Sequence, residues 1–87
     1  MSYTVEYLKS VIKKDISTLS HPIAMQIKKV IEEKLMVDPV GFGKPLRYSL
    51  KGCRSLRVGD YRILYQINKK IILIIAIKHR KEVYEDA

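Results

Sequence analysis

The 87-residue sequence has a single cysteine and no apolar run long enough to cross a membrane. Because Cys53 has no partner for an internal disulfide, and because no secretory leader pattern opens the chain, we expect a reducing, cytoplasmic location. The longest apolar run, residues 71–77, falls far short of the roughly 20 residues that a membrane-spanning helix needs. Its β-branched content predicts a buried strand instead, and the sequence indicates no membrane partner.

The sequence also lacks the usual patterns of metal, nucleotide and carboxylate-based sites. His21 and His79 lie far apart, and with one cysteine they give no metal-ligand spacing. The glycines form neither a P-loop nor a dinucleotide-binding fingerprint, so we expect no metal and no cofactor. Residues 39–59 contain no aspartate or glutamate, so this region offers no carboxylate as a general base.

Length and hydrophobic periodicity predict one domain spanning residues 1–87. Period-two alternation predicts strands, and recurrence at three or four residues predicts a helical hairpin that turns at Ser20-His21-Pro22. The order β-α-α-β-β-β predicts an α+β fold, with the helical hairpin packed on one face of a small, mainly antiparallel twisted sheet. The predicted elements are a strand at 3–7, helices at 8–19 and 23–35, a short edge strand or turn at 46–50, and strands at 54–58, 61–67 and 71–77.

Positive charge is the feature that the chain has in excess. Lysine and arginine total 17 against 9 acidic residues, a formal net charge of +8. Residues 44–87 carry +7 of this charge and all of the arginines. A guanidinium binds phosphate in a planar, bidentate manner and stays charged, so arginines gathered in a predicted sheet favour a nucleic-acid ligand.

The predicted turns bring several of these cations to one side of the sheet. A two-residue turn at 59–60 places Arg57 opposite Arg62, and a three-residue loop at 68–70 places Arg62 opposite Ala76. A change of one residue in either loop would reverse the side on which the following residues lie. The cations that share this side are Arg57, Arg62, Lys78 and, if the last strand continues, Arg80.

Two segments resemble the RelE/ParE superfamily of bacterial and archaeal toxins, and the likeness is closer to the RelE branch. The first is Leu-Arg-Val-Gly-Asp-Tyr-Arg-Ile-Leu-Tyr at 56–65, and the second is His-Arg-Lys-Glu-Val-Tyr at 79–84. The resemblance implies the toxin of a type II toxin–antitoxin system, which enters the ribosomal decoding site and cuts mRNA there. It also implies an acidic antitoxin that wraps the toxin, in a complex that binds operator DNA through the antitoxin.

The resemblance implies catalytic roles for four residues. Arg62 and Arg80 match positions that hold and stabilise the scissile phosphate. Arg57 matches a basic position on the preceding strand, and Tyr84 matches an aromatic residue that orients the substrate. Well-known members carry a Lys-x-Lys pair where this chain has Cys-Arg-Ser-Leu-Arg at 53–57, so the resemblance leaves the general base unassigned.

Further basic residues flank these positions. RNA backbone is expected to be held in salt-sensitive contacts by Lys44, Arg47 and Lys51. Arg54 and Lys78 are expected to support the phosphate site. His79 is either a general acid or a structural hydrogen-bonding group. The candidate substrate-binding residues are Lys44, Arg47, Lys51, Arg54, Lys78 and His79.

The leading hypothesis is a metal-independent, ribosome-dependent mRNA endoribonuclease that inhibits translation. Arginines suit the stabilisation of a phosphorane, whereas a site poor in acid–base groups depends strongly on substrate alignment. Two alternatives stay open at this point. One is a ParE-like inhibitor of DNA gyrase, and the other is a basic module that binds ribosomal RNA without catalysis.

Overall fold

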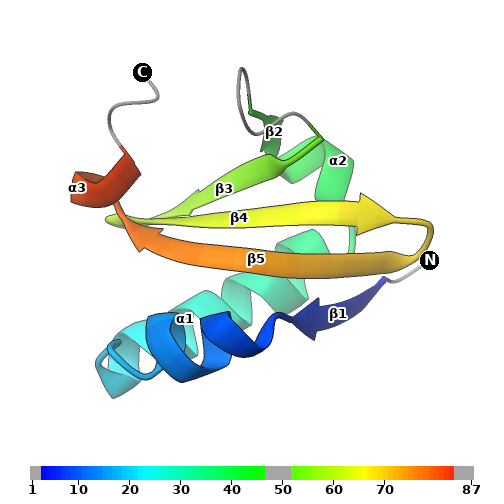
Figure 1. Ribbon diagram of the computed structural model, residues 1–87. Helices are drawn as coiled ribbons and strands as arrows, with labels where there is room; N and C mark the ends of the chain where they lie inside the picture. Colours follow the sequence, from blue (N-terminus) through cyan, green and yellow to red (C-terminus); the bar gives the residue numbers. More distant parts are fainter. Residues whose placement is uncertain (1–2, 47–51, 84–87) are drawn as a thin grey trace.

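The computed structural model describes residues 3–46 and 52–83, which form a sheet with helices packed on one of its faces (Figure 1). Two of the helices, η1 and η2, are π-helical and therefore wider than an α-helix. The helices are η1 (Val11–Ile16), α1 (His21–Val30), η2 (Ile31–Leu35), α2 (Pro39–Phe42) and α3 (Arg80–Val83). The strands are β1 (Thr4–Tyr7), β2 (Lys44–Pro45), β3 (Arg54–Val58), β4 (Tyr61–Asn68) and β5 (Ile71–His79).

The strands lie in the order β1-β5-β4-β3-β2. β2 to β5 form an antiparallel meander, while β1 pairs in parallel with the first half of β5. The predicted α+β fold with a helical hairpin on a mainly antiparallel sheet is therefore confirmed. The predicted element at 46–50 lies mostly outside the described residues, and β2 begins before it, at Lys44.

The helical layer follows the apolar periodicity of its sequence. α1 begins after Ser20, whose extended backbone stands at the N-cap position without a side-chain capping bond, and Pro22 occupies the first turn. α1 runs directly into η2, and the two present buried isoleucine and leucine side chains to the sheet. η2 ends at Leu35, and Asp38 starts the short helix α2. The Asp38 carboxylate caps α2 because it accepts the Gly41 N–H at 3.0 Å. No helix within residues 3–46 and 52–83 is long and apolar enough to span a membrane.

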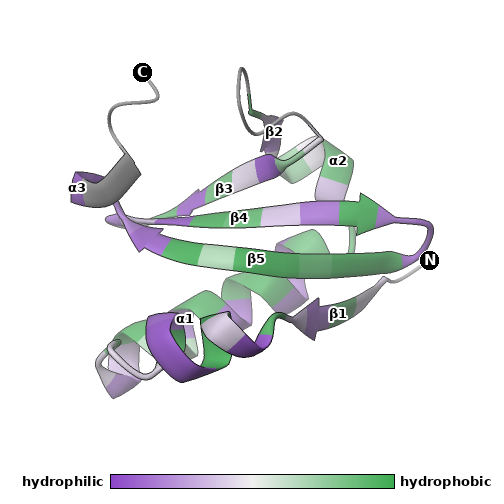
Figure 2. Ribbon diagram, in the orientation of Figure 1, coloured by the Kyte–Doolittle hydropathy of each residue, from purple (hydrophilic) through white to green (hydrophobic). Residues whose placement is uncertain are grey.

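The core lies between the helices and one face of β3, β4 and β5, where the apolar residues of the sheet and of α1 meet (Figure 2). Tyr65 is fully buried there, and its hydroxyl donates a hydrogen bond to the Pro39 carbonyl at 2.6 Å. A side chain at Gly43 would collide with this hydroxyl, which explains the glycine at that position. Burial raises the pKa of Tyr65 above its ordinary value of 10.0 because the phenolate would lose its hydration.

The two hairpins fix the register of the sheet, and one differs from its prediction. Gly59 turns with φ near 59°, so the two-residue turn at 59–60 is confirmed. The second turn has two residues, Lys69 and Lys70, because Asn68 pairs with Ile71, so the predicted three-residue loop is wrong. A β-bulge follows, where Tyr65 pairs with Ile74 but Leu64 pairs with Ala76, so β5 carries one extra residue.

The shorter turn and the bulge each shift the pairing of β4 with β5 by one residue. Together they put Lys78 on the same face of the sheet as Arg62, as predicted. Arg62 consequently lies opposite Lys78 and not opposite Ala76. Arg57, Arg62 and Lys78 thus share one side as predicted, and Arg57 faces Arg62 as predicted, while the partner of Arg62 on β5 differs.

Candidate phosphate-binding site on the sheet

Three cations form a row across the sheet, one on each strand of the meander. Arg57 pairs with Arg62, and Arg62 pairs with Lys78. The next row contains Leu56, Ile63 and Ile77, which are buried against the helices. Because neighbouring residues on a strand point to opposite faces, the row of cations lies on the face that is turned away from the helices. We call this the outer face, and we call Arg57, Arg62 and Lys78 the cation row.

The two arginines of the row have no acidic partner among the side chains that the structure describes. Arg57 is exposed, and its Nε donates to the Gly59 carbonyl at 3.2 Å, while Arg62 is half-buried. Within the described parts of the chain, no carboxylate lies within ion-pairing distance of either guanidinium. Like charges directly opposite each other on a sheet destabilise it, so folding alone gives no reason for this arrangement. An anion bound across the row would offset the repulsion.

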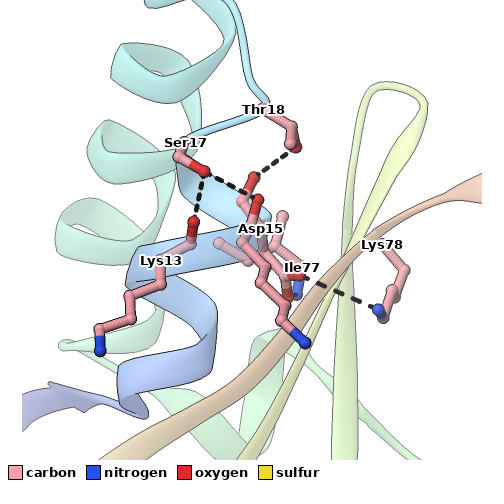
Figure 3. Close-up of polar contacts among 7 residues, drawn as sticks. Lys13, Asp15, Ser17, Thr18, Ile77 and Lys78 are labelled. Carbon is pink, nitrogen blue, oxygen red and sulfur yellow. Dashed lines mark hydrogen bonds and ion pairs between the residues drawn. The ribbon is translucent and has the colours of Figure 1, made fainter.

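Lys78, at the end of the row, contacts an acidic residue from the helical layer. Its Nζ lies 3.9 Å from Oδ1 of Asp15 in η1, and Oδ2 of the same carboxylate accepts the Ile77 N–H at 2.8 Å (Figure 3). The Lys78 side chain is 41% exposed, so this long ion pair is weak and solvent-screened. Lys78 therefore stays accessible to a second anion.

His79 and Arg80 follow the row at the end of β5. His79 falls on the helix-facing side, where its ring meets Tyr61 edge-on at 5.1 Å and its Nδ1 accepts the Lys81 N–H at 3.2 Å. Arg80 is exposed, and its N–H donates to the Asp60 carbonyl at 2.7 Å, which continues the ladder one step beyond Lys78. α3 begins at this residue, so the His-Arg pair lies where the strand ends beside the first turn.

Arg54 has a different position from the one that its predicted role requires. It pairs with Tyr65, whose side chain is buried against α2, so it lies on the helix-facing side. Its Nη2 donates to the carbonyls of Val40 at 2.8 Å and Gly43 at 3.0 Å. Arg54 thus braces the segment around α2 from inside and does not join the cation row.

Of the remaining predicted site residues, the structure describes only Lys44. Lys44 is exposed on β2 and pairs with Ser55, two residues before Arg57, so it falls on the outer face. Arg47, Lys51 and Tyr84 lie outside the described residues. Asp15 was not among the predicted site residues, although it follows Leu8 and Val11 at helical spacing and so interrupts an apolar stripe with a charge.

The helical layer carries an apolar groove of about 340 Å³ between η1 and α1. Ile12 and Met25 line it and are each about half exposed, at 53% and 52%. Leu19 and Lys28 also line it, the first half-buried and the second exposed. Exposed apolar side chains of this size gathered in one groove are typical of a surface that binds a partner.

The helical hairpin on one face of a small sheet and the row of cations on the other belong to a small basic toxin of a type II toxin–antitoxin system. The chain belongs to the ParE toxin family of type II toxin–antitoxin systems, whose family model matches residues 5–84. The toxin RelG of Mycobacterium tuberculosis is 33% identical over 86 residues, which cover 97% of this chain and 98% of that protein. The predicted membership of the RelE/ParE superfamily, on its RelE-like side, is confirmed.

Solved structures show the same likeness. A chain of the RelBE2 toxin–antitoxin complex from M. tuberculosis superimposes with a TM-score of 0.85 at 32% identity, covering 92% of this chain and 100% of that chain. A chain of the RelB–RelE antitoxin–toxin complex from Methanococcus jannaschii gives a TM-score of 0.71 at 26% identity, covering 91% and 94%.

Proposed function

We propose that this toxin is a metal-independent endoribonuclease that cuts mRNA on the ribosome and so inhibits translation. The observation that carries the proposal is the cation row, in which Arg57 and Arg62 lie on the outer face with no acidic partner among the described side chains, and Arg80 follows directly after β5. Guanidinium groups on neighbouring strands can bind two non-bridging oxygens of one phosphodiester, and they bind more strongly as charge develops on those oxygens.

The proposed reaction is an attack by the ribose 2′-hydroxyl on the adjacent phosphorus. The 2′-oxygen forms a bond to phosphorus and loses its proton to a base, while the bond to the 5′-oxygen breaks and that oxygen takes up a proton. The arginines stabilise the phosphorane between these events. Because Nδ1 of His79 accepts the Lys81 N–H, the neutral ring carries its proton on Nε2. Because this neutral ring is a poor acid and lies on the helix-facing side, the structural hydrogen-bonding reading of His79 is favoured, and Tyr84 is the titratable candidate for the acid.

We propose dependence on the ribosome because the cation row can bind phosphate but offers few groups that transfer protons. Arginine is a poor base at neutral pH, and residues 39–59 contain no carboxylate, so the groups close to the row bind phosphate better than they move protons. Alignment of the reacting atoms, worth up to about 7–11 kcal/mol, must then provide much of the rate. A ribosome that presents the mRNA already bent would provide it.

An acidic antitoxin is the proposed partner of the helical layer. The groove between η1 and α1 is apolar and has Lys28 among its lining residues, and the two helices carry further exposed lysines, among them Lys13 and Lys29. An amphipathic helix with apolar residues on one side and acidic residues beside them fits such a groove. The structural relatives include complexes of a RelE with its RelB antitoxin, which supports the proposal. Operator DNA is proposed to bind to the toxin–antitoxin complex through the antitoxin.

A translating extract with added toxin tests the nuclease, with cut sites mapped by primer extension. Arg62→Gln should lower the cleavage rate by about 100-fold, the usual effect of removing one transition-state donor. Arg62→Lys should keep most of the RNA affinity and still lose rate, because an ammonium cannot replace the planar fork. Lys29→Gln is the matched control, since it removes the same charge from an exposed position in the helical layer.

Two results would overturn the proposal. Equal cleavage by wild type and Arg62→Gln would show that the cation row takes no part in catalysis. Rapid cutting of naked RNA that ribosomes do not accelerate would show that cleavage does not depend on the ribosome. The family model, which is that of ParE toxins, favours inhibition of DNA gyrase as a second candidate function. A supercoiling assay beside the primer-extension map separates the two. Tight RNA binding with no cleavage would indicate the third reading, a non-catalytic module for ribosomal RNA.

A further inference from the structure

Along the second half of β5, one of its two edges has no neighbouring strand among the described residues. β1 pairs with β5 only up to Ile74, and the last bond of this ladder runs from the Leu8 N–H to the Ile74 carbonyl at 3.1 Å. β5 itself continues to His79, and η1 packs beside this second half. Ile77 is only 4% exposed, so its N–H has little access to water and needs a protein acceptor.

The Asp15 carboxylate supplies that acceptor. Oδ2 accepts the Ile77 N–H at 2.8 Å, in the place where the next residue of a strand would otherwise pair. The end of η1 that carries Asp15 is itself fixed, because the Thr18 hydroxyl donates to the Asp15 carbonyl at 2.9 Å and the Ser17 hydroxyl donates to the Lys14 carbonyl at 3.2 Å (Figure 3). These bonds close the end of η1, and the Asp15 carboxylate lies directly against β5.

The same carboxylate acts on the cation row. Its second oxygen, Oδ1, lies 3.9 Å from the Lys78 Nζ, and Lys78 is the direct cross-strand partner of Arg62. The Asp15 side chain is 15% exposed, so its charge is less screened than that of a surface residue. Attraction to Asp15 favours positions of the Lys78 ammonium near η1 at the edge of the sheet.

We propose that Asp15 is a positioning residue of the cation row, because its carboxylate caps the edge of β5 at Ile77 and attracts the Lys78 ammonium toward that edge, beside Arg57 and Arg62. This inference rests on the proposed function, namely that the row binds RNA phosphate. Asp15 leaves Arg57 and Arg62 as the principal phosphate ligands and keeps Lys78 as a cation that is only partly available. It also fixes the strand end that delivers Arg80.

Two substitutions separate the two effects of Asp15. Asp15→Asn removes the charge but keeps an amide oxygen for the Ile77 N–H, whereas Asp15→Ala removes both. Amide hydrogen exchange by NMR reports the strand edge: the Ile77 amide should exchange within about threefold of wild type in Asp15→Asn and about 10- to 100-fold faster in Asp15→Ala, which leaves a buried donor unpaired. Unchanged protection of this amide in Asp15→Ala would refute the role at the edge.

The charge effect is measured as binding of a short, uncleavable 2′-O-methyl oligoribonucleotide by the full chain over a range of salt concentrations. Freeing Lys78 in Asp15→Asn should raise the affinity about threefold or more at low salt. It should also steepen the slope of log affinity against log salt by about 0.7, the value for one added contact to single-stranded phosphate. The double variant Asp15→Asn/Lys78→Gln should lose this gain, and the matched control is Lys78→Gln alone. A gain that persists without Lys78, or no gain at all, would refute the proposal.

These results are distinguishable from failure of the proposed function. If Arg57→Gln/Arg62→Gln binds the oligonucleotide as well as wild type does, the row is not an RNA site, and both the proposed function and the positioning of Lys78 for RNA fail together. If that double variant loses binding while Asp15→Asn behaves as wild type, the RNA site stands and the inference about Asp15 alone is wrong.

Discussion

Replacing Arg62 by glutamine should make the free toxin more stable, although it removes the central cation of the proposed site. Arg62 has a cation directly opposite on both sides, Arg57 on β3 and Lys78 on β5. At a charge separation of roughly 7 Å and a water-like dielectric constant, each pair costs about 0.6 kcal/mol, so the two pairs cost about 1 kcal/mol. Measured cross-strand effects of about 0.2–1 kcal/mol per pair agree with this estimate.

Urea unfolding of the antitoxin-free chain at low and high salt measures this repulsion. Arg62→Gln should raise the free energy of unfolding by about 1 kcal/mol in 20 mM salt, and the gain should nearly vanish in 1 M salt, where the screening length is about 3 Å. Lys29→Gln, which removes a charge outside the row, should change the stability by less than about 0.5 kcal/mol in both conditions. A loss of stability in Arg62→Gln, or a gain that salt does not change, would show that the guanidinium is compensated within the fold and would refute the reasoning.

Further predictions concern the core, the pH dependence and the groove. Tyr65→Phe leaves a buried carbonyl without its donor and should cost about 1–3 kcal/mol of unfolding free energy in urea titrations. Gly43→Ala should cost less in that background than in wild type, because the colliding hydroxyl is gone; equal costs would contradict the packing described. Burial raises the pKa of both Tyr65 and Tyr7 above 10.0, so the stability should be full below pH 10.0 and fall as the pH rises above it, with a smaller fall in Tyr65→Phe. A pH profile that Tyr65→Phe leaves unchanged would contradict this assignment. Ile12→Asp should lower antitoxin affinity at least tenfold in a co-purification or titration, whereas Val40→Asp, equally exposed but outside the groove, should not. Equal losses of affinity in the two variants would show that the antitoxin does not bind in the groove.

The sequence predicts the main architecture because its local signals agree with one another. The glycine at the first turn determines a two-residue hairpin, and this hairpin places Arg57 opposite Arg62. The second hairpin shows the limit of such reasoning. Its turn is one residue shorter than predicted, and the bulge in β5 corrects the side again. No local residue pattern predicts this bulge, because it depends on how β5 packs against β1 and β4.

The residues whose contacts the sequence does not reveal are those with long-range partners. Arg54 lies in a run of basic residues, and only the folded chain shows that its guanidinium binds the carbonyls of Val40 and Gly43. Asp15 similarly has a partner, Ile77, that is 62 residues away along the chain. Composition and spacing identify such residues as charged, but they do not reveal which backbone groups lack a partner in the fold.

The central claim is that the two guanidinium groups of the row bind one phosphodiester, and NMR of the arginine Nε–H groups tests it most directly. On titration with a 2′-O-methyl dinucleotide, the signals of Arg57 and Arg62 should shift together along one saturable curve. The Arg54 signal should stay in place, because its guanidinium already binds carbonyls inside the protein. A shift of Arg54 alone, or saturation of the dinucleotide without any change at Arg57 and Arg62, would contradict the account.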